Sequence, residues 1–472
     1  MDGGGSIVAN PLGSFVNQNK RKYWNSEIES LSHEDIKLLQ FEKLKKQLHY
    51  CYDNSSFYKG KFIEAGAEPG DIKTIDDFRN LPVFINKDED RKGQEVTRLQ
   101  EGHPFGLQLC ANPEDVVAIN ATSGTTGVPT FYAFSEHDLS VQNESFARGY
   151  WRAGIRPGDR VLMATGLSMW LGGTSVMRGL QDMGACPIPV GVESGTERTL
   201  NFAKLTKPSA MVTLPSIATR FIEKAPEILG MDVKDLGIKR IFALGEPGAS
   251  IPEIRNRIEE AYGATLYDGA TGIWGLHSIS CDSPEYTGLH AYCEDNIILW
   301  DIIDPVTKKP LEIKNGAIGE QILTTLDWKA SPALRYAIGD LIQIYTEPCP
   351  HCGFSWLRWK IIGRTDDVLN IKGVKLYPAG LKEVIEKFIP QITGEFRIVL
   401  NEKPPKVTPP LHVKVEAGRD IREGDFIHIA KEIEDACSRS LSVRPSLSMV
   451  PFDSLSRSKD ISKKTSFFER NY

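Results

Sequence analysis

Residues 121–130 read Ala121-Thr-Ser-Gly-Thr-Thr-Gly-Val-Pro-Thr130, a loop rich in hydroxyl side chains and glycine that follows an apolar run. Glycines let a backbone turn tightly and bring its N–H groups close to an anion, and hydroxyl side chains add further donors. This composition suits the polyphosphate of a nucleotide, although the Gly-Lys-Ser/Thr of a Walker A loop is absent. A Ser/Thr/Gly-rich surface loop without a ligand is the alternative. The candidate phosphate-binding residues are Ser123, Gly124, Thr125, Thr126, Gly127 and Thr130.

The segments that follow this loop alternate between short β-rich runs and longer amphipathic stretches. Strands that alternate with helices favour βαβ units and a mostly parallel sheet with helices on both faces, so we expect an α/β fold. The expected strands cover 116–121, 160–166, 210–215 and 240–245, and two of the expected helices cover 216–229 and 251–262.

The two ends of the chain differ from this central pattern. Residues 27–65 carry apolar side chains at helical spacing, with Ser32 as a candidate N-cap and Asp35 three residues later. Residues 66–110 are expected to be loop-rich, and 295–346 to form antiparallel strands joined by turns.

After Gly363 we expect a small α+β unit with a boundary near 364–367. Its expected elements are a strand pair at 367–377, a helix at 379–388, strands at 395–401 and 411–415, and a helix at 424–440. The predicted organisation is a large domain, 1–365, with an antiparallel subdomain at 281–360, and a small mobile C-terminal domain, 366–472.

Composition narrows the function. The chain has 472 residues, enough for about two to four domains. Its 62 acidic and 56 basic residues give a net charge of −6, so we expect no nucleic-acid partner and no membrane association. The N-terminus lacks the pattern of a signal peptide, and eight cysteines are spread along the chain, which predicts a reduced cytoplasm.

Five further motifs follow the phosphate loop in order, and together they resemble the adenylate-forming superfamily of acyl-CoA synthetases, peptide-synthetase adenylation domains and luciferases. Within it the chain is most similar to the phenylacetate-CoA ligase family, from about Trp24 to the C-terminus, with Ser55-Ser-Phe-Tyr58 and a Cys/His set as further likenesses. The five motifs are Leu244-Gly-Glu-Pro247, Tyr267-Asp-Gly-Ala-Thr271, Arg335-Tyr-Ala-Ile-Gly-Asp340, Gly363-Arg-Thr-Asp-Asp367 and Ile371-Lys-Gly-Val-Lys-Leu-Tyr-Pro378.

This resemblance implies an ATP-dependent acid-CoA ligase. A carboxylate and ATP give an acyl-adenylate and pyrophosphate, and CoA then gives the thioester and AMP. The resemblance implies that Asp340 binds the ribose hydroxyls, that Arg364 reaches the ribose or a phosphate, and that Asp366 is the hinge between the domains. Thr126 and Arg364 are expected to act in catalysis. The other residues implied to bind the nucleotide are Gly245, Glu246, Pro247, Tyr267 and Asp268.

Two departures from the family pattern affect the reaction centre. We expect Lys463 to be the adenylation lysine, with Lys464 and Lys459 as alternatives, although the tail lacks the family's usual Gly-Lys after Pro-Arg. Where the family has a Mg²⁺-binding glutamate this chain has Gly272, so either water or another carboxylate such as Glu246 fills that position. Mg²⁺ is still expected, because the ATP phosphates need charge neutralisation.

A Cys-x-x-Cys pair, Cys349-Pro-His-Cys352, has the spacing of a zinc knuckle, and a cysteine and a histidine lie upstream of it. Four such ligands form the closed tetrahedral set of a structural zinc site, which would stabilise the antiparallel subdomain and take no part in catalysis. Free thiols or a redox pair are the alternatives. The expected ligands are Cys281, His290, Cys349 and Cys352, with Cys293 and His351 as substitutes.

The resemblance also assigns an acyl pocket, whose bulky indoles favour a small substrate. A carboxylate at Asp268 would accept a hydrogen bond from a substrate hydroxyl, which favours a short branched 2-hydroxy acid such as 2-hydroxyisobutyrate over an aryl acetate such as phenylacetate. The alternative is that the indoles only fill the core and that Asp268 is an adenine or backbone partner, and the glycine pair could equally leave room for a ring. The expected pocket residues are Trp170, Gly172, Gly173, Asp268, Ala270 and Trp274.

Two other functions are compatible with these residues. One is an adenylation enzyme that loads a carrier-protein thiol in place of CoA, since no motif defines the acceptor surface. The other is a catalytically degenerate zinc-containing binding protein, which the missing glutamate and the unusual lysine segment support. A homodimer is plausible for each of these functions.

Overall fold

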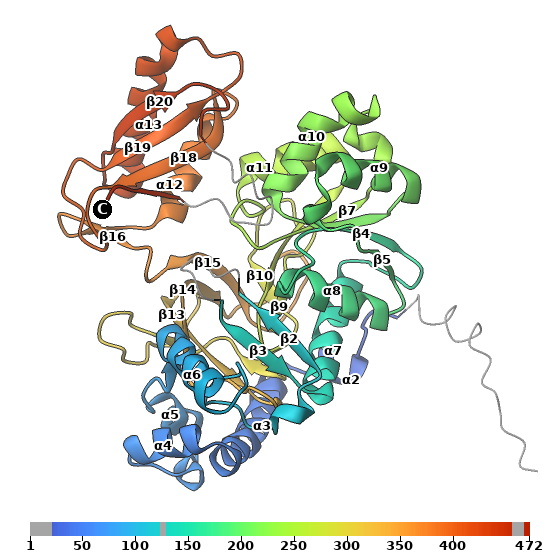
Figure 1. Ribbon diagram of the computed structural model, residues 1–472, viewed down its shortest axis with the longest axis vertical. Helices are drawn as coiled ribbons and strands as arrows, with labels where there is room; N and C mark the ends of the chain where they lie inside the picture. Colours follow the sequence, from blue (N-terminus) through green and yellow to red (C-terminus); the bar gives the residue numbers. More distant parts are fainter. Residues whose placement is uncertain (1–20, 123–128, 456–466) are drawn as a thin grey trace, which may run out of the picture.

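The computed structural model describes residues 21–122, 129–455 and 467–472 (Figure 1). A sheet of 13 strands forms the larger part of the molecule. Its parallel half has the strand order β5-β4-β6-β7-β8, and it confirms the three later strands expected from the sequence. These strands are β4 (Arg160–Ala164), β5 (Cys186–Ile188), β6 (Ala210–Thr213), β7 (Arg240–Leu244) and β8 (Thr265–Thr271).

Helices cover both faces of the parallel half, because alternate side chains of each strand point to opposite faces. Val161 and Met163 lie in one hydrophobic cluster with residues of α7 and α8. Leu162 and Ala164 lie in another, with residues of α9, α10 and α11. The helices are α7 (Glu136–Arg152), α8 (Leu171–Asp182), α9 (Thr196–Thr206), α10 (Pro215–Leu229) and α11 (Pro252–Tyr262).

The other half of the sheet is mostly antiparallel, as expected for 295–346, and continues from β8 through β9, β10, β15, β14 and β13 to β11. The short strand β1 (Ile85–Asn86) joins β14 in parallel, and β2 (Ala118–Ala121) and β3 (Phe131–Phe134) form a separate antiparallel pair. The remaining strands are β9 (His277–Ile279), β10 (Leu289–Ala291), β11 (Ile297–Ile298), β12 (Ile302–Ile303), β13 (Ile318–Thr325), β14 (Tyr336–Tyr345) and β15 (Arg358–Arg364).

The N-terminal region is helical, and the Ser32 hydroxyl accepts a hydrogen bond from the Asp35 N–H, so the predicted cap is confirmed. The expectation of a loop-rich stretch at 66–110 was wrong, because α6 occupies 14 of its residues. The helices are α2 (Ser26–Glu29), α3 (His33–Asn54), α4 (Ser56–Glu64), α5 (Ile75–Arg79) and α6 (Lys87–Gln100). In the part of the chain that the structure describes, no helix combines the length and apolar character needed to cross a membrane.

The sequence pattern did not predict α6, because most of the side chains that this helix buries are polar. Asp90 is fully buried and accepts hydrogen bonds from the side chains of Gln94, Gln108 and Tyr336. Burial raises the pKa of Asp90 to about 6. A helix that buries hydrogen-bonded polar groups carries no apolar stripe, so periodicity does not reveal it.

The C-terminal domain has a sheet of its own, with order β20-β19-β18-β21, and a hydrophobic cluster drawn entirely from residues after 368. Figure 1 shows it beside the larger part of the molecule, next to β15 and α11. This confirms the predicted small α+β unit. Its elements are β16 (Leu369–Ile371), β17 (Val374–Leu376), α12 (Pro378–Ile385), the short 3₁₀ helix Glu386–Phe388, β18 (Ile392–Leu400), β19 (His412–Ala417), α13 (Phe426–Leu441), β20 (Ser446–Val450) and β21 (Phe468–Arg470).

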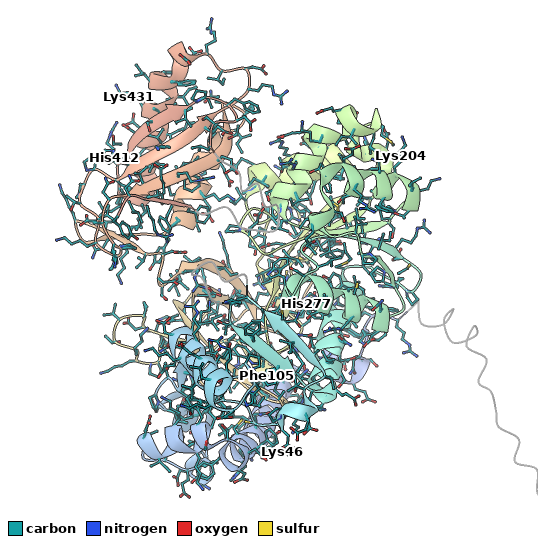
Figure 2. All side chains as sticks on the ribbon, in the orientation of Figure 1. Lys46, Phe105, Lys204, His277, His412 and Lys431 are labelled. Carbon is teal, nitrogen blue, oxygen red and sulfur yellow. The ribbon has the colours of Figure 1, made fainter. Side chains whose placement is uncertain are left out.

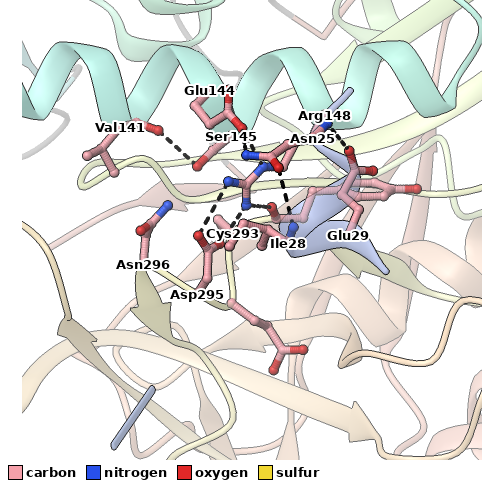
Figure 3. A network of polar contacts seen from close by, with 12 residues as sticks. Asn25, Ile28, Glu29, Val141, Glu144, Ser145, Arg148, Cys293, Asp295 and Asn296 are labelled. Atoms are coloured by element: carbon pink, nitrogen blue, oxygen red, sulfur yellow. Dashed lines mark hydrogen bonds and ion pairs between the residues drawn. The ribbon is translucent and has the colours of Figure 1, made fainter. Parts of the chain in front are cut away.

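A buried polar network attaches the N-terminal segment to α7 (Figure 3). The Arg148 guanidinium donates to both carboxylate oxygens of Asp295, at 2.6 and 3.3 Å, and to Glu144 at 3.1 Å. Glu144 in turn accepts hydrogen bonds from the side chains of Trp24 and Asn25. The network thus joins three segments that are far apart in the sequence.

We predict that Arg148→Ala lowers the free energy of unfolding by about 3–5 kcal/mol, because it leaves Asp295 buried without its partner charge. Urea unfolding followed by tryptophan fluorescence measures the change. The control is Lys45→Ala, which removes an exposed pair with Glu42 on α3 and should cost less than about 1 kcal/mol. Equal, small effects of the two substitutions would contradict this account of the network.

Candidate active site

The acyl and nucleotide motifs meet at one edge of the parallel half-sheet. Trp170 lies between β4 and α8, immediately before α8, the Gly245–Pro247 turn follows β7, and Asp268 is the middle residue of β8. Open α/β sheets bind their ligands in the crevice outside the carboxyl ends of the strands. The order of the strands therefore assembles motifs that are about 100 residues apart in the sequence.

The base of the phosphate loop is a strand pair that also holds the acyl segment. The Thr122 N–H donates to the Thr130 carbonyl, and the Thr130 N–H donates to the Thr122 hydroxyl. On the other side of the strand, the Ala121 N–H donates to the Met169 carbonyl, next to Trp170. The loop residues proposed to contact phosphate, Ser123, Gly124, Thr125, Thr126 and Gly127, lie outside the described residues, as do Lys459, Lys463 and Lys464.

Arg364 connects the predicted ribose carboxylate with the predicted hinge. It is the last residue of β15 and pairs in register with Asp340 on β14, to which its guanidinium donates at 2.8 Å. The same guanidinium donates to both oxygens of Asp366, at 2.8 and 3.2 Å. Gly339 has a φ of +80°, and a Cβ there would lie 3.0 Å from the Arg364 guanidinium, so the close approach requires glycine.

Lys87, the first residue of α6, belongs to the same group of charges, and the sequence analysis did not find it. Its pKa is lowered mainly by burial and then by the charge of Arg364, while Asp340 and Asp366 oppose the shift. The pairing of Asn86 with Ala337 on β14 brings Lys87 to this place. No sequence signal was available, because Lys87 begins a helix whose buried residues are mostly polar.

The Trp170 indole fits only because two neighbours are glycines. A Cβ at Gly172 would lie 2.8 Å from the indole ring, and a Cβ at Gly245 would lie 2.7 Å from it. Gly173 is equally constrained, since a Cβ there would lie 2.0 Å from the Gly166 carbonyl oxygen. The Glu193 carboxylate fixes the segment before Trp170 by accepting hydrogen bonds from two backbone N–H groups, at 2.9 and 3.3 Å. The indole therefore lies between the start of α8 and the turn after β7.

The other expected pocket and adenine residues differ in burial. The Asp268 carboxylate accepts a hydrogen bond of 2.7 Å from Tyr286, and burial raises its pKa to about 6. Ala270 is half-buried near the end of β8. Tyr267 is stacked on Phe242 inside the core.

Trp274 lies in the interior, not at an open face. Its indole is 3% exposed, contacts the rings of Tyr132 and Tyr336, and donates a hydrogen bond of 2.7 Å to the Ser331 carbonyl. These contacts correspond to the core-filling role that the sequence analysis named as the alternative for the indoles. Trp170 is consequently the indole with the better position to limit an acyl group.

This chain has Gly272 in place of the Mg²⁺-binding glutamate of the family, and Glu246 in the Gly245–Pro247 turn does not replace that glutamate directly. Gly272 directly follows β8, and its N–H donates a hydrogen bond to the Leu276 carbonyl. The Glu246 carboxylate accepts a hydrogen bond of 2.7 Å from the Ser216 N–H at the start of α10. That oxygen caps a helix, so the alternative in which Glu246 substitutes for the glutamate loses support.

His277, labelled in Figure 2, begins β9 beside the end of β8, but it is a core residue. Its ring is fully buried between Phe146 and Tyr150, and burial lowers its pKa to about 3. Gly149 provides the space, since a Cβ there would lie 2.7 Å from the imidazole. A neutral, enclosed histidine is unsuited to proton transfer with a substrate.

The four expected metal ligands lie together, with their ligand atoms all within 4.8 Å of one another. The Sγ atoms of Cys281 and Cys349 are 3.9 Å apart, and the Cys352 Sγ lies 3.3 Å from the His290 Nε2. A tetrahedral site with Zn–S bonds of about 2.3 Å places two sulfurs about 3.8 Å apart. The His290 Nδ1 is 3.2 Å from the Gly288 carbonyl, an interaction that leaves Nε2 free to bind a metal. These residues fit a closed site for zinc.

This fold, with ligand motifs at the strand ends and a small domain beyond Asp366, defines an adenylate-forming enzyme. Residues 373–468 match the family described as the AMP-binding enzyme C-terminal domain. The chain is 32% identical to the phenylacetate-coenzyme A ligase of Thermus thermophilus over 390 residues, which are 80% of this chain and 81% of that protein. The chain belongs to the phenylacetate-CoA ligase family.

Solved structures of a 2-hydroxyisobutyryl-CoA ligase are also similar to this chain. In the postadenylation state with 2-HIB-AMP, that enzyme is 26% identical, with a TM-score of 0.84 over 96% of this chain and 93% of that one. In its thioesterification state, with 2-HIB-AMP and CoA, it is 27% identical, and the TM-score is 0.68 over the same shares of the two chains. The domain arrangement described here is therefore the more similar to the postadenylation state.

The chain is an AMP-forming acid-CoA ligase. In the first half-reaction a carboxylate oxygen attacks the α-phosphorus of ATP, and the bond to pyrophosphate breaks. In the second, the CoA sulfur attacks the acyl carbon, and the bond to AMP breaks. Adenylation gives a poor electrophile a good leaving group, and its catalysis consists mostly of positioning and charge stabilisation.

We predict that Asp340→Asn raises the KM for ATP about tenfold in acid-dependent pyrophosphate release, because it removes a charged acceptor from the ribose and from Arg364. The control is Asp367→Asn, which changes a neighbouring carboxylate at the same junction. An ATP KM within about twofold of the unsubstituted enzyme would contradict a ribose-binding role for Asp340.

Proposed function

We propose that this ligase activates a short branched 2-hydroxy acid, such as 2-hydroxyisobutyrate, in preference to an aryl acetate such as phenylacetate. The observation that carries the proposal is the Trp170 indole, which occupies the space between Gly172 and Gly245. A fixed indole shortens the space available to an acyl group, and Glu193 restrains the segment that carries it. Asp268 would accept a hydrogen bond from the substrate hydroxyl.

Phenylacetate is the second candidate, because the relative from Thermus thermophilus is a phenylacetate-CoA ligase at 32% identity. The solved 2-hydroxyisobutyryl-CoA ligase is 26% identical. Since a difference of this size does not separate two acids, the geometry at Trp170 is the better guide. The acid-CoA ligase activity of the family sets aside the other two functions considered from the sequence, the loading of a carrier-protein thiol and a degenerate binding protein.

We further propose that Asp366 is the hinge, that Lys463 is the adenylation lysine, and that ATP is bound with Mg²⁺. Because Gly272 offers no carboxylate and Glu246 caps α10, water takes the place of the glutamate on the metal. Lys87 and Arg364 add positive charge beside the nucleotide site. The eight free cysteines support a reduced cytoplasm, and a homodimer stays a prediction.

We predict that Trp170→Ala raises kcat/KM for phenylacetate about tenfold or more and lowers it for 2-hydroxyisobutyrate, because the space released suits a ring. Pyrophosphate release with Mg-ATP and CoA measures both values. The matched control is Trp274→Phe, which changes an indole of the core and should leave the ratio of the two values unchanged. If Trp170→Ala lowers both values equally, Trp170 does not select the acid.

We also propose that Cys281, His290, Cys349 and Cys352 bind a structural zinc ion. The purified protein is expected to contain one zinc per chain by mass spectrometry of the metal. Cys349→Ser should lose the metal and lower the thermal midpoint by several degrees, because metal binding contributes to folding. Cys186→Ser, at an exposed cysteine outside the cluster, should change neither quantity. Absence of zinc together with an unchanged midpoint would exclude the site.

A further inference from the structure

A lysine of the C-terminal domain contacts the Gly245–Pro247 turn. Lys382, on α12, donates a hydrogen bond of 2.8 Å from its Nζ to the carbonyl oxygen of Pro247, the last residue of the Gly245–Pro247 turn. The same ammonium lies 3.4 Å from the Glu386 carboxylate, one helical turn further on. The lysine side chain is 16% exposed, but the hydrogen bond lies at the surface because Pro247 is exposed.

A second contact crosses the same junction. The Lys360 Nζ on β15 lies 2.8 Å from the Glu383 carboxylate on α12. The Tyr377 ring covers Gly363, where a Cβ would lie 3.1 Å from it. Lys382 and Glu383 both follow Asp366 in the chain, whereas Pro247 and Lys360 precede it. Any rotation of the C-terminal domain at Asp366 therefore breaks both contacts.

The two contacts differ in what they touch. Lys360 and Glu383 form an ion pair near the junction, and the charge of Lys360 also acts on the Asp268 carboxylate, but among the described residues the pair makes no hydrogen bond to the Gly245–Pro247 turn. Lys382 instead holds the carbonyl of a turn that packs against Trp170 through Gly245. It therefore connects the position of the C-terminal domain with the shape of the acyl pocket. A hydrogen bond from a charged donor is stronger than one between neutral groups and fixes the carbonyl direction.

We propose that Lys382 is a positioning residue for the adenylation half-reaction. It fixes the Gly245–Pro247 turn while the C-terminal domain has the arrangement described here, and it plays no part once the domain has rotated. The inference rests on the two-step reaction and does not depend on which acid is used. Loss of Lys382 should slow adenylation and leave thioester formation unchanged. A general loss of stability would slow both half-reactions.

The test compares the two half-reactions in Lys382→Met. Acid-dependent exchange of pyrophosphate into ATP, with 2-hydroxyisobutyrate and phenylacetate as probes, should fall about tenfold or more. Thioester formation from CoA and the synthetic adenylate of either acid should stay within about twofold of the unsubstituted rate. Lys382→Arg, which keeps a charged donor, should restore the exchange. Equal loss of both rates, or no loss of exchange, would overturn the proposal.

Glu386 requires its own control, because removal of Lys382 leaves its carboxylate buried beside Glu253 and Glu395, and burial raises the pKa of Glu386 to about 7. The double variant Lys382→Met/Glu386→Gln removes that charge and should still show the selective loss of exchange. Glu386→Gln alone should keep normal exchange. Lys387→Met, at an exposed lysine five residues from Lys382, should behave as the unsubstituted enzyme.

A measurement of the distance between the two domains needs no acid, so it tests the role of Lys382 independently of the substrate proposal. Dyes placed on the two domains report their distance by energy transfer, and Lys382→Met should reduce the population with the close distance. A shift in distance with no activity on either probe acid would refute the substrate proposal and support the role of Lys382. Unchanged distances combined with unchanged exchange would refute the role of Lys382 alone.

Discussion

The interaction on which the active site depends is the pairing of Arg364 with two carboxylates. One guanidinium donates to Asp340 on the neighbouring strand and to Asp366 at the start of the C-terminal domain. Because the guanidinium is planar and its donors are fixed in direction, it holds both carboxylates in defined positions. The register of β14 and β15, which places Asp340 opposite Arg364, is what makes this possible. The predicted ribose site and the predicted hinge are thus parts of a single arrangement.

The parallel half-sheet supplies the rest of the site by topology. Strands β4, β7 and β8 end at the same edge, so the segments after them lie together although they are far apart in the sequence. Glycines at 172 and 245 leave the space for Trp170, and the turn that contains Gly245 also accepts a hydrogen bond from the C-terminal domain. The proposed pocket residue Trp170 and the C-terminal domain thus contact the same backbone turn.

The sequence predicted those parts of the fold that carry a clear apolar pattern. The runs at 160–166, 210–215 and 240–245 are almost continuously apolar and form strands buried on both faces, and the helices that alternate with them are amphipathic. It failed at α6, which buries Asp90 and other hydrogen-bonded polar groups, and Lys87 was missed with it. The Cys349–Cys352 pair was recognisable from its spacing, and the structure brings it together with Cys281 and His290 as candidate metal ligands. Burial was not predictable: Trp170 and Trp274 have the same side chain, and only the packing around each distinguishes a pocket wall from a core residue.

The central claim is that this chain activates a small carboxylic acid with ATP and transfers it to CoA. The most direct measurement is product analysis of the purified protein with Mg-ATP, CoA and a panel of short 2-hydroxy acids, linear acids, benzoates and aryl acetates. The account predicts that pyrophosphate, AMP and one acyl-CoA form in equal amounts, with a branched 2-hydroxy acid as the best substrate. Pyrophosphate release without any thioester on CoA, or no reaction with any acid, would contradict it.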